Sequence, residues 1–227
     1  MMRKLRKVKK MRGPMIVLVI MLSIGLVGSF MLSGSGVRSG QPIVDQNMNI
    51  EEQVKYLEGL LEKYNEEYQT KPDNEETVGM LAEIHWYLAG LSEEKDKQEE
   101  HLKASLGFYE KLLEKKPNNA EILTRIAIVS YQAGEEEKAE EYFNKSLEID
   151  PNSINALANY GVFLMNTKGD FHGALTQFEK ALEQDMPEQD KEQIGLFVTI
   201  AKQMIEALEN NEQELPDTGE NTNQPAN

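Results

Sequence analysis

Few residues of this sequence could perform chemistry. The chain contains no cysteine, which excludes a thiolate nucleophile, a disulfide framework and cysteine metal ligands. Its three histidines, His85, His101 and His172, fall on separate predicted helices or turns, and their spacing fits no metal-ligand motif. A glycine-rich phosphate loop, H-E-x-x-H and G-x-S-x-G are all missing from the sequence. We therefore expect a protein that is not an enzyme and that uses no cofactor and no metal.

The pentapeptide LPDTG, residues 215–219, is the pattern at which a transpeptidase attaches proteins to the cell wall of Gram-positive bacteria. That reaction also requires an apolar segment and basic residues after the pentapeptide. Gly219 is followed by ENTNQPAN, which contains neither. We therefore expect LPDTG to be a chance match inside a disordered acidic tail over residues 210–227.

The charges of the chain are unevenly distributed. The net charge is −15, yet residues 1–12 carry seven basic side chains and the first acidic residue is Asp45. The rest of the chain therefore holds 17 basic residues against 39 acidic ones. Such an acidic body repels nucleic acid and anionic lipid, so we expect no nucleic-acid partner.

An uncharged apolar stretch follows the basic residues, from Met15 to Leu32. As a helix it would be about 27 Å long, enough to cross a thin bilayer core. The basic flank predicts a cytoplasmic N-terminus and an extracytoplasmic body. We expect a basic cytoplasmic segment (1–13) and a transmembrane signal anchor (14–32) in a single-pass protein of the cell membrane. The alternative is a signal peptide cleaved near Ser33-Gly34-Ser35. We favour the anchor because the stretch is longer than a usual signal-peptide core and lacks an A-x-A site.

Residues 33–49 are rich in Gly, Ser and Asn and predict a flexible linker. A helix is predicted next, over 50–69, ended by Pro72-Asp73-Asn74. Apolar residues recur in it at steps of three and four, namely Ile50, Val54, Leu57, Leu61, Tyr64 and Tyr68. This stripe could pack on the element that follows or form a coiled-coil dimer. We favour packing because the stripe spans fewer than three heptads.

Two segments of the chain repeat each other, residues 120–153 and 154–188. The second copy has one extra residue before Gly169 and another before Pro187. The matched pairs are Ala127 and Gly161, Gly134 and Gly169, Ala139 and Ala174, Phe143 and Phe178, and Leu147 and Leu182. A divergent copy over about 75–119 keeps the same frame, with roughly eleven more residues around LSEEKDKQEEH.

This unit resembles the tetratricopeptide repeat (TPR), a helix-turn-helix pair of about 34 residues. In the central copy the resemblance is carried by Leu123, Ile126, Ala127, Gly134, Ala139, Phe143, Leu147 and Pro151. It implies an all-α fold, a short TPR helical-hairpin solenoid over 50–209 preceded by one transmembrane helix. The repeats would be 75–119, 120–153 and 154–188, closed by a capping helix over 188–209. The layout resembles that of bacterial membrane-tethered TPR proteins.

The resemblance also implies a peptide-binding groove, lined by the first helix of each pair. The family's groove positions fall on Glu83, Trp86, Tyr87, Glu121, Thr124, Arg125, Ile128, Tyr131, Asn155, Asn159, Val162 and Met165. Apolar and aromatic side chains with a few carboxylates and amides suit an extended or helical peptide.

We therefore expect a non-catalytic, membrane-anchored TPR adaptor that binds protein or peptide partners outside the cytoplasm. Its role would be the assembly or quality control of an envelope complex. Two alternatives stay open at this point. One is a self-associating structural module that uses helix 50–69 or solenoid stacking, and the other is a secreted TPR protein released by signal-peptide cleavage. The sequence leaves the oligomeric state and the identity of the partner unknown.

Overall fold

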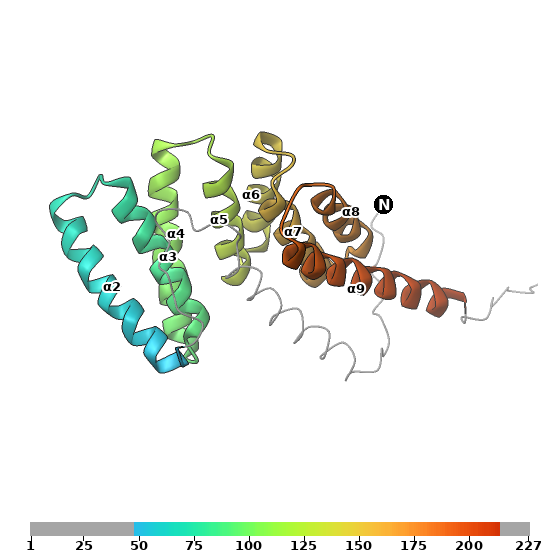
Figure 1. The fold of residues 1–227 in the computed structure, drawn as a ribbon, viewed down its shortest axis with the longest axis horizontal. Coiled ribbons are helices and arrows are strands. Elements are labelled where there is room, and N and C mark those ends of the chain that lie inside the picture. Colours follow the sequence, from blue (N-terminus) through green and yellow to red (C-terminus); the bar gives the residue numbers. More distant parts are fainter. Residues whose placement is uncertain (1–47, 214–227) are drawn as a thin grey trace, which may run out of the picture.

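The structure, a computed structural model, describes residues 48–213, and within that range it contains helices and no strand. The helices are α2 (Ile50–Thr70), α3 (Glu75–Leu91), α4 (Lys95–Lys115), α5 (Ala120–Gln132), α6 (Glu136–Ile149), α7 (Ile154–Phe163), α8 (Phe171–Leu182) and α9 (Glu188–Gln213), with a π-helical turn, η1 (Leu164–Lys168), after α7. Neighbours in the chain pack on each other and form a row from α2 to α9 (Figure 1). The predicted all-α solenoid is confirmed for the described residues.

Short polar side chains begin the first helix of each hairpin. Asn74, Asn119 and Ser153 accept hydrogen bonds from backbone N–H groups in the first turns of α3, α5 and α7. These groups would otherwise have no partner, because an α-helix leaves its first four N–H groups unpaired. In the tripeptides at 72–74, 117–119 and 151–153, which all begin with proline, the third residue therefore caps the helix that opens the next hairpin.

Glycine closes the turn inside two of the hairpins. Gly134 and Gly169 have φ angles of 77° and 62°, in the left-handed region that residues with a Cβ rarely adopt. After α5 the closing bond runs from the N–H of Glu135 to the carbonyl of Ser130. After η1 the equivalent bond runs from Asp170 to Leu164, across one more residue. The extra residue of the last repeat is thus accommodated as a π-helical turn.

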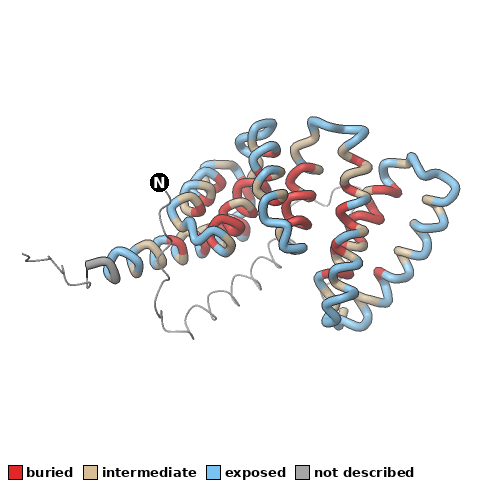
Figure 2. Tube along the Cα trace, turned by 180° about the vertical axis from the view of Figure 1, so that it is seen from behind, coloured by how far each residue is buried: buried red, intermediate tan, exposed pale blue. Residues whose placement is uncertain are grey.

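The core is continuous from α3 to α9 and consists mainly of the residues that the repeat frame predicts. Ala127, Ala139, Phe143, Ala174 and Phe178 are all fully buried. Figure 2 shows the buried residues along the facing sides of the helices, with exposed residues on the outer sides. Stacking therefore buries an apolar face that a single hairpin would leave in water.

The helix at each end of the row covers its neighbour. In α2, Leu57 is fully buried against α3, with Val54, Leu61 and Tyr64 partly buried beside it. Ile50, the first residue of the predicted stripe, is exposed instead, because it lies in the first turn of the helix. At the other end Ile194, Phe197 and Ala201 of α9 are buried. These contacts fit the closing role expected for both helices.

The divergent hairpin is longer than the other two. Its helices α3 and α4 have 17 and 21 residues, whereas α5 and α6 have 13 and 14. The loop between the helices has three residues in both hairpins, so the additional residues of this copy lengthen the two helices.

Among residues 48–213 no helix is long and apolar enough to span a bilayer. The predicted anchor (14–32), its basic flank (1–13), most of the linker (33–49) and the LPDTG pentapeptide lie outside the described residues.

Candidate functional site

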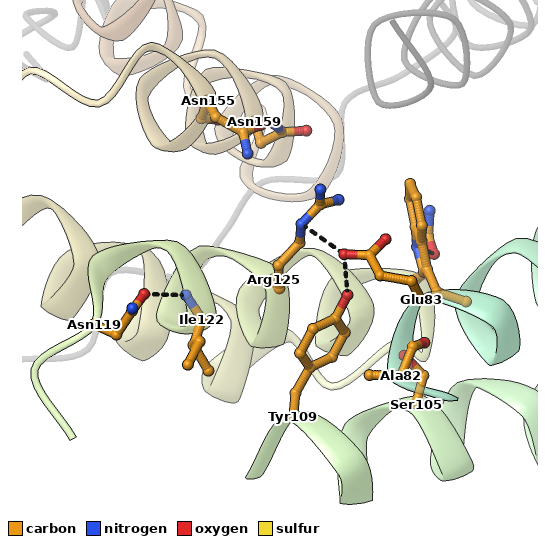
Figure 3. Close-up of polar contacts among 11 residues, drawn as sticks. Ala82, Glu83, Ser105, Tyr109, Asn119, Ile122, Arg125, Asn155 and Asn159 are labelled. Carbon is orange, nitrogen blue, oxygen red and sulfur yellow. Dashed lines mark hydrogen bonds and ion pairs between the residues drawn. The ribbon is translucent and has the colours of Figure 1, made fainter. Parts of the chain in front are cut away.

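A buried ion pair joins the first two hairpins. Arg125 of α5 places its Nε 3.3 Å from Oε1 of Glu83 in α3, and the two side chains are only 11% and 9% exposed. The hydroxyl of Tyr109, in α4, donates a hydrogen bond of 2.7 Å to the same carboxylate oxygen. Figure 3 shows the three side chains meeting between α3, α4 and α5. Three helices are therefore connected through one carboxylate.

Aromatic rings surround this ion pair. The Arg125 guanidinium lies 5.5 Å from the centroid of the Trp86 ring, within range of a cation–π contact. The Trp86 indole N–H donates a 2.7 Å hydrogen bond to Oε1 of Gln132, at the end of α5. The Tyr87 ring meets Trp86 edge-on, with centroids 5.0 Å apart. We call Glu83, Trp86, Tyr87, Tyr109 and Arg125 the Glu83–Arg125 cluster.

The environment shifts the pKa values of three members of this cluster, Tyr87, Tyr109 and Arg125. Burial raises the pKa of Tyr109 well above its usual value, and the Glu83 carboxylate raises it further. Burial and Glu83 raise the pKa of Tyr87 in the same way. For Arg125 burial is the largest single effect and lowers the pKa, but Glu83, Tyr109, Tyr87 and Glu121 together raise the pKa overall. Both tyrosines thus stay neutral and Arg125 stays charged at physiological pH.

One oxygen of the ion pair has no partner. Oε2 of Glu83 is buried and accepts no hydrogen bond from any described residue, and the Nε of Arg125 lies near Oε1 without hydrogen-bond geometry. Buried polar groups are nearly always paired, since an unpaired one costs about 1–3 kcal/mol. The cluster therefore encloses one buried acceptor that no described residue satisfies.

A second set of polar side chains lies where α5 faces α7. Asn159 donates from Nδ2 to the backbone oxygen and to Oδ1 of Asn155, at 2.8 and 2.7 Å. Asn166 of η1 donates a 3.2 Å hydrogen bond to the hydroxyl of Tyr131. In Figure 3 the outer nitrogens of Arg125 point toward α7, which carries Asn155 and Asn159. The first helices of the three hairpins, α3, α5 and α7, thus present one polar and aromatic surface, which we call the α3/α5/α7 face.

The predicted groove residues divide into two groups by exposure. The buried ones are Glu83, Trp86, Thr124, Ile128, Asn159, Val162 and Met165, and the partly or fully exposed ones are Tyr87, Glu121, Arg125, Tyr131 and Asn155. Ile128 and Val162 are only 1% and 3% exposed. The structure therefore differs from the expectation of an open apolar groove, because these side chains pack into the common core of adjacent hairpins.

Tyr109 has a polar role that the sequence analysis did not assign to it. Tyr109, Phe143 and Phe178 occupy equivalent positions, 34 and 35 residues apart, and all three are buried. Only Tyr109 carries a hydroxyl, and a buried tyrosine hydroxyl normally finds a hydrogen-bond partner. A tyrosine in place of phenylalanine was therefore a signal for a polar partner, which the structure identifies as Glu83.

The described residues offer no group of three or more His, Asp or Glu side chains that could hold a metal ion. What the α3/α5/α7 face presents instead is the partly exposed side chains of Tyr87, Arg125 and Tyr131. Tyr and Arg are enriched among the residues that contribute most of the binding energy in protein interfaces.

Comparison with known proteins agrees with this architecture. A family model described as tetratricopeptide repeat matches residues 97–160. The photosystem I assembly protein Ycf3 of Rippkaea orientalis is 33% identical over 128 residues, which cover 56% of this chain and 67% of that protein. A protein CTR9 homolog of Arabidopsis thaliana is 32% identical over 122 residues, and the BBSome complex member BBS4 of Bos taurus is 35% identical over 78 residues.

The matches with the last two proteins span only 11% and 15% of their lengths. Among solved structures, the crystal structure of MamA superposes with a TM-score of 0.50 at 17% identity, over 73% of this chain and 96% of that one, a likeness of fold alone. The repeat frame, the helical hairpins and the extent of the match with Ycf3 lead to one conclusion. The chain belongs to the tetratricopeptide repeat family.

Proposed function

We propose that this chain is a non-catalytic adaptor whose α3/α5/α7 face binds a segment of a partner protein. The observation that carries the proposal is that four polar or aromatic side chains of this face, Tyr87, Arg125, Tyr131 and Asn155, remain partly exposed. Their hydroxyl, guanidinium and amide groups can pair with the backbone or side chains of a bound peptide. Arg125, and Tyr131 further along α5, are residue types at which binding energy concentrates in protein interfaces.

A peptide partner fits this face better than a small molecule does. The polar groups are spread along three successive helices and do not converge on one point. Such a row suits an extended chain that makes repeated contacts. The name of Ycf3, an assembly protein, supports a role in assembly for this chain as well.

The adaptor would act outside the cytoplasm of a bacterial cell. The basic segment 1–13 and the apolar segment 14–32 support a single-pass anchor, and the linker 33–49 would carry the repeats of residues 50–209 away from the membrane. The acidic tail 210–227 would follow. In this position the protein would gather partners for the assembly or quality control of an envelope complex.

Photocrosslinking tests the binding face. A photoreactive residue replaces Tyr131 in the full chain, and a matched control replaces Asn144, which is exposed on α6. The proposal expects a discrete crosslinked partner from position 131 and none, or a much weaker one, from position 144. Capture of the same proteins with equal yield at both positions, or of lipid and the chain itself alone, would remove the main support for an adaptor.

Cysteine labelling tests the orientation, because the natural chain has no cysteine and hence no background. Asn144→Cys should react with a membrane-impermeant maleimide in intact cells, whereas Lys4→Cys should react only after lysis. Labelling of Asn144→Cys only after lysis would contradict an extracytoplasmic repeat domain. Release of Asn144→Cys protein into the medium would favour the secreted alternative.

One observation favours self-association as a second candidate function. A shallow, mainly apolar surface on the outer side of α2 is lined by Glu52, Lys55, Tyr56, Gly59 and Leu60. Tyr56 is 37% exposed there, which is high for a large aromatic side chain. Light scattering of a fragment covering residues 45–210 measures its oligomeric state and so tests self-association. A monomer at high concentration would disfavour self-association through α2.

A further inference from the structure

Two histidines meet between the helices of the divergent hairpin. The Nδ1 atoms of His85, in α3, and His101, in α4, lie 2.9 Å apart, which is hydrogen-bonding distance. One imidazole must donate and the other accept, so at least one of the two rings is neutral. Both rings are partly buried. The hydrogen bond therefore joins α3 to α4 only while the pair carries no more than one extra proton.

The surroundings of the pair extend its influence to α2. The ring of His85 stacks on Phe108 at 5.8 Å between centroids, and Phe108 in turn meets Tyr68 of α2 edge-on at 5.5 Å. The charged groups that act on His101 are Glu58 from α2 and Lys97 and Glu100 from α4. Loss of the histidine contact would thus loosen a junction of three helices.

We infer that His85 and His101 form an acid-sensitive latch, which holds α3 against α4 at neutral pH and releases it when both rings are protonated. A first proton goes to His101, which lies near two carboxylates and can still donate to His85. A second proton leaves two donors facing each other with no acceptor between them, and two positive charges at 2.9 Å.

The direction of the pH effect follows from the pKa values. Burial, helped by a charge on His101, lowers the pKa of His85 from the usual 6.5 to about 4. Burial also lowers the pKa of His101, although Glu100 and Glu58 oppose this. The unfolded chain therefore binds more protons than the folded chain between these values. The stabilising contribution of the pair is therefore complete above about pH 6.5 and is lost as the pH falls toward about 4. Within this range each additional proton that the unfolded chain binds lowers the folding equilibrium constant by up to about tenfold per pH unit.

The latch would also regulate the binding face, a consequence that rests on the proposed function. His85 directly precedes Trp86 and follows Glu83 by two positions, so the same turn of α3 carries latch and binding residues. Separation of α3 from α4 would draw Glu83 away from the hydroxyl of Tyr109. Mild acid is thus expected to weaken partner binding before it unfolds the remaining hairpins.

Urea unfolding of the full chain in neutral detergent tests the latch, with Trp86 as its single fluorescent tryptophan. Unfolding is followed at about pH 7.5 and about pH 5, which bracket most of the titration window. The variant His85→Phe removes the titrating ring and keeps a flat side chain against Phe108. The control His172→Gln alters the third histidine, which is exposed on α8.

Between about pH 7.5 and about pH 5 the folding equilibrium constant should decrease in all three proteins. The factor of this decrease should be at least about tenfold larger for the natural chain and the control than for His85→Phe. Equal losses in all three proteins would overturn the latch. If His85→Phe fails to fold at neutral pH, His85→Leu, which also removes the titrating ring, takes its place with the same expectation. NMR gives a second readout: the His85 ring should titrate near pH 4, and a midpoint near the ordinary value of about 6.5 would refute the latch.

Crosslinking from position 131 at about pH 7.5 and at about pH 4, where the His85 ring titrates, separates the two proposals. A partner captured at neutral pH and lost in acid by the natural chain, but retained by His85→Phe, supports both. No partner at neutral pH would refute the adaptor, while the unfolding comparison would still decide the latch. A partner retained in acid by the natural chain would show that the latch does not control binding.

Discussion

Gly161 of α7 lies against the ring of Phe178 in α8. A Cβ built on Gly161 would stand 2.5 Å from Cε1 of that ring and 2.8 Å from Cδ1 and Cζ, closer than real carbon contacts allow. Phe178 is fully buried and stacks on Phe197 of α9 at 5.4 Å between centroids, so it has little room to move. In the last hairpin α7 can therefore approach α8 this closely only because Gly161 has no side chain.

Gly161→Ala should therefore destabilise the protein although alanine is the better helix former. Overpacking in a filled core costs about 1–3 kcal/mol, which exceeds the gain of about 1 kcal/mol in helix propensity. The control is Gly195→Ala in α9, where an added Cβ meets no atom within 4 Å, and this variant should gain up to about 1 kcal/mol. Urea unfolding measures both. Equal stabilisation by the two substitutions would show that Phe178 moves aside freely.

The hairpins could be predicted from the sequence because their signals are local. Asn119 and Ser153 cap helices, Gly134 and Gly169 turn the chain, and the repeat places buried residues at fixed spacings. The single-residue insertion before Gly169 was visible as well, but not the way in which the chain accommodates it. A loop extension and a π-helical turn have the same sequence signature, and only packing on α8 selects between them.

Deletion of Lys168 should convert η1 into the shorter turn that closes α5. The remaining sequence, LMNTGD, would align with SYQAGE of the preceding repeat, and Met165 and Asn166 would keep their positions relative to α7. The deletion also removes the 2.9 Å ion pair of Lys168 with Glu140, which is partly exposed and contributes at most about 1 kcal/mol. Circular dichroism and urea unfolding should show an intact fold with a loss no larger than this.

Deletion of Val162, near the end of α7, serves as the control because it rotates Phe163 and the residues of η1 relative to the rest of α7 and should unfold the hairpin. A Lys168 deletion as damaging as the Val162 deletion would mean that the π-helical turn is required for packing.

The Glu83–Arg125 ion pair should behave as a unit. Arg125→Met leaves the buried Glu83 carboxylate without its cation and should cost about 3–5 kcal/mol. Addition of Glu83→Gln removes the charge and keeps an acceptor for the hydroxyl of Tyr109, so the double variant should be more stable than Arg125→Met alone. Urea unfolding of the single and double variants gives the coupling energy.

The exposed ion pair of Lys145 and Glu141 provides the comparison for the buried Glu83–Arg125 ion pair. Its atoms are 2.6 Å apart, yet both side chains are about half exposed, so Lys145→Met should change stability by less than about 1 kcal/mol. Additive effects of Arg125→Met and Glu83→Gln would indicate that water screens the ion pair in solution and that the cluster is more open than the structure shows.

The candidate site was harder to predict than the fold, because exposure depends on several helices at once. A repeat position says which side of its own helix a residue occupies, but not how closely the next hairpin packs there. Tyr131 and Asn155 remain partly exposed to solvent. Ile128 and Val162 lie on the same two helices and are buried. The pairing of Glu83 with Tyr109 needed the distance between α3 and α4, which sequence spacing does not contain.

Ile128→Asp separates these two descriptions of the α3/α5/α7 face. If Ile128 lined an open groove, a charge there would impair partner binding and leave folding intact. The structure buries Ile128 to 1% exposure in the core between hairpins, so the substitution should place an unpaired carboxylate in an apolar site and cost at least about 4 kcal/mol. Loss of the cooperative urea transition is the expected result, with Asn144→Asp on the exposed side of α6 as an unaffected control. An Ile128→Asp protein that unfolds like the natural chain but no longer crosslinks from position 131 would instead mean that the face opens in solution and that the apolar groove exists.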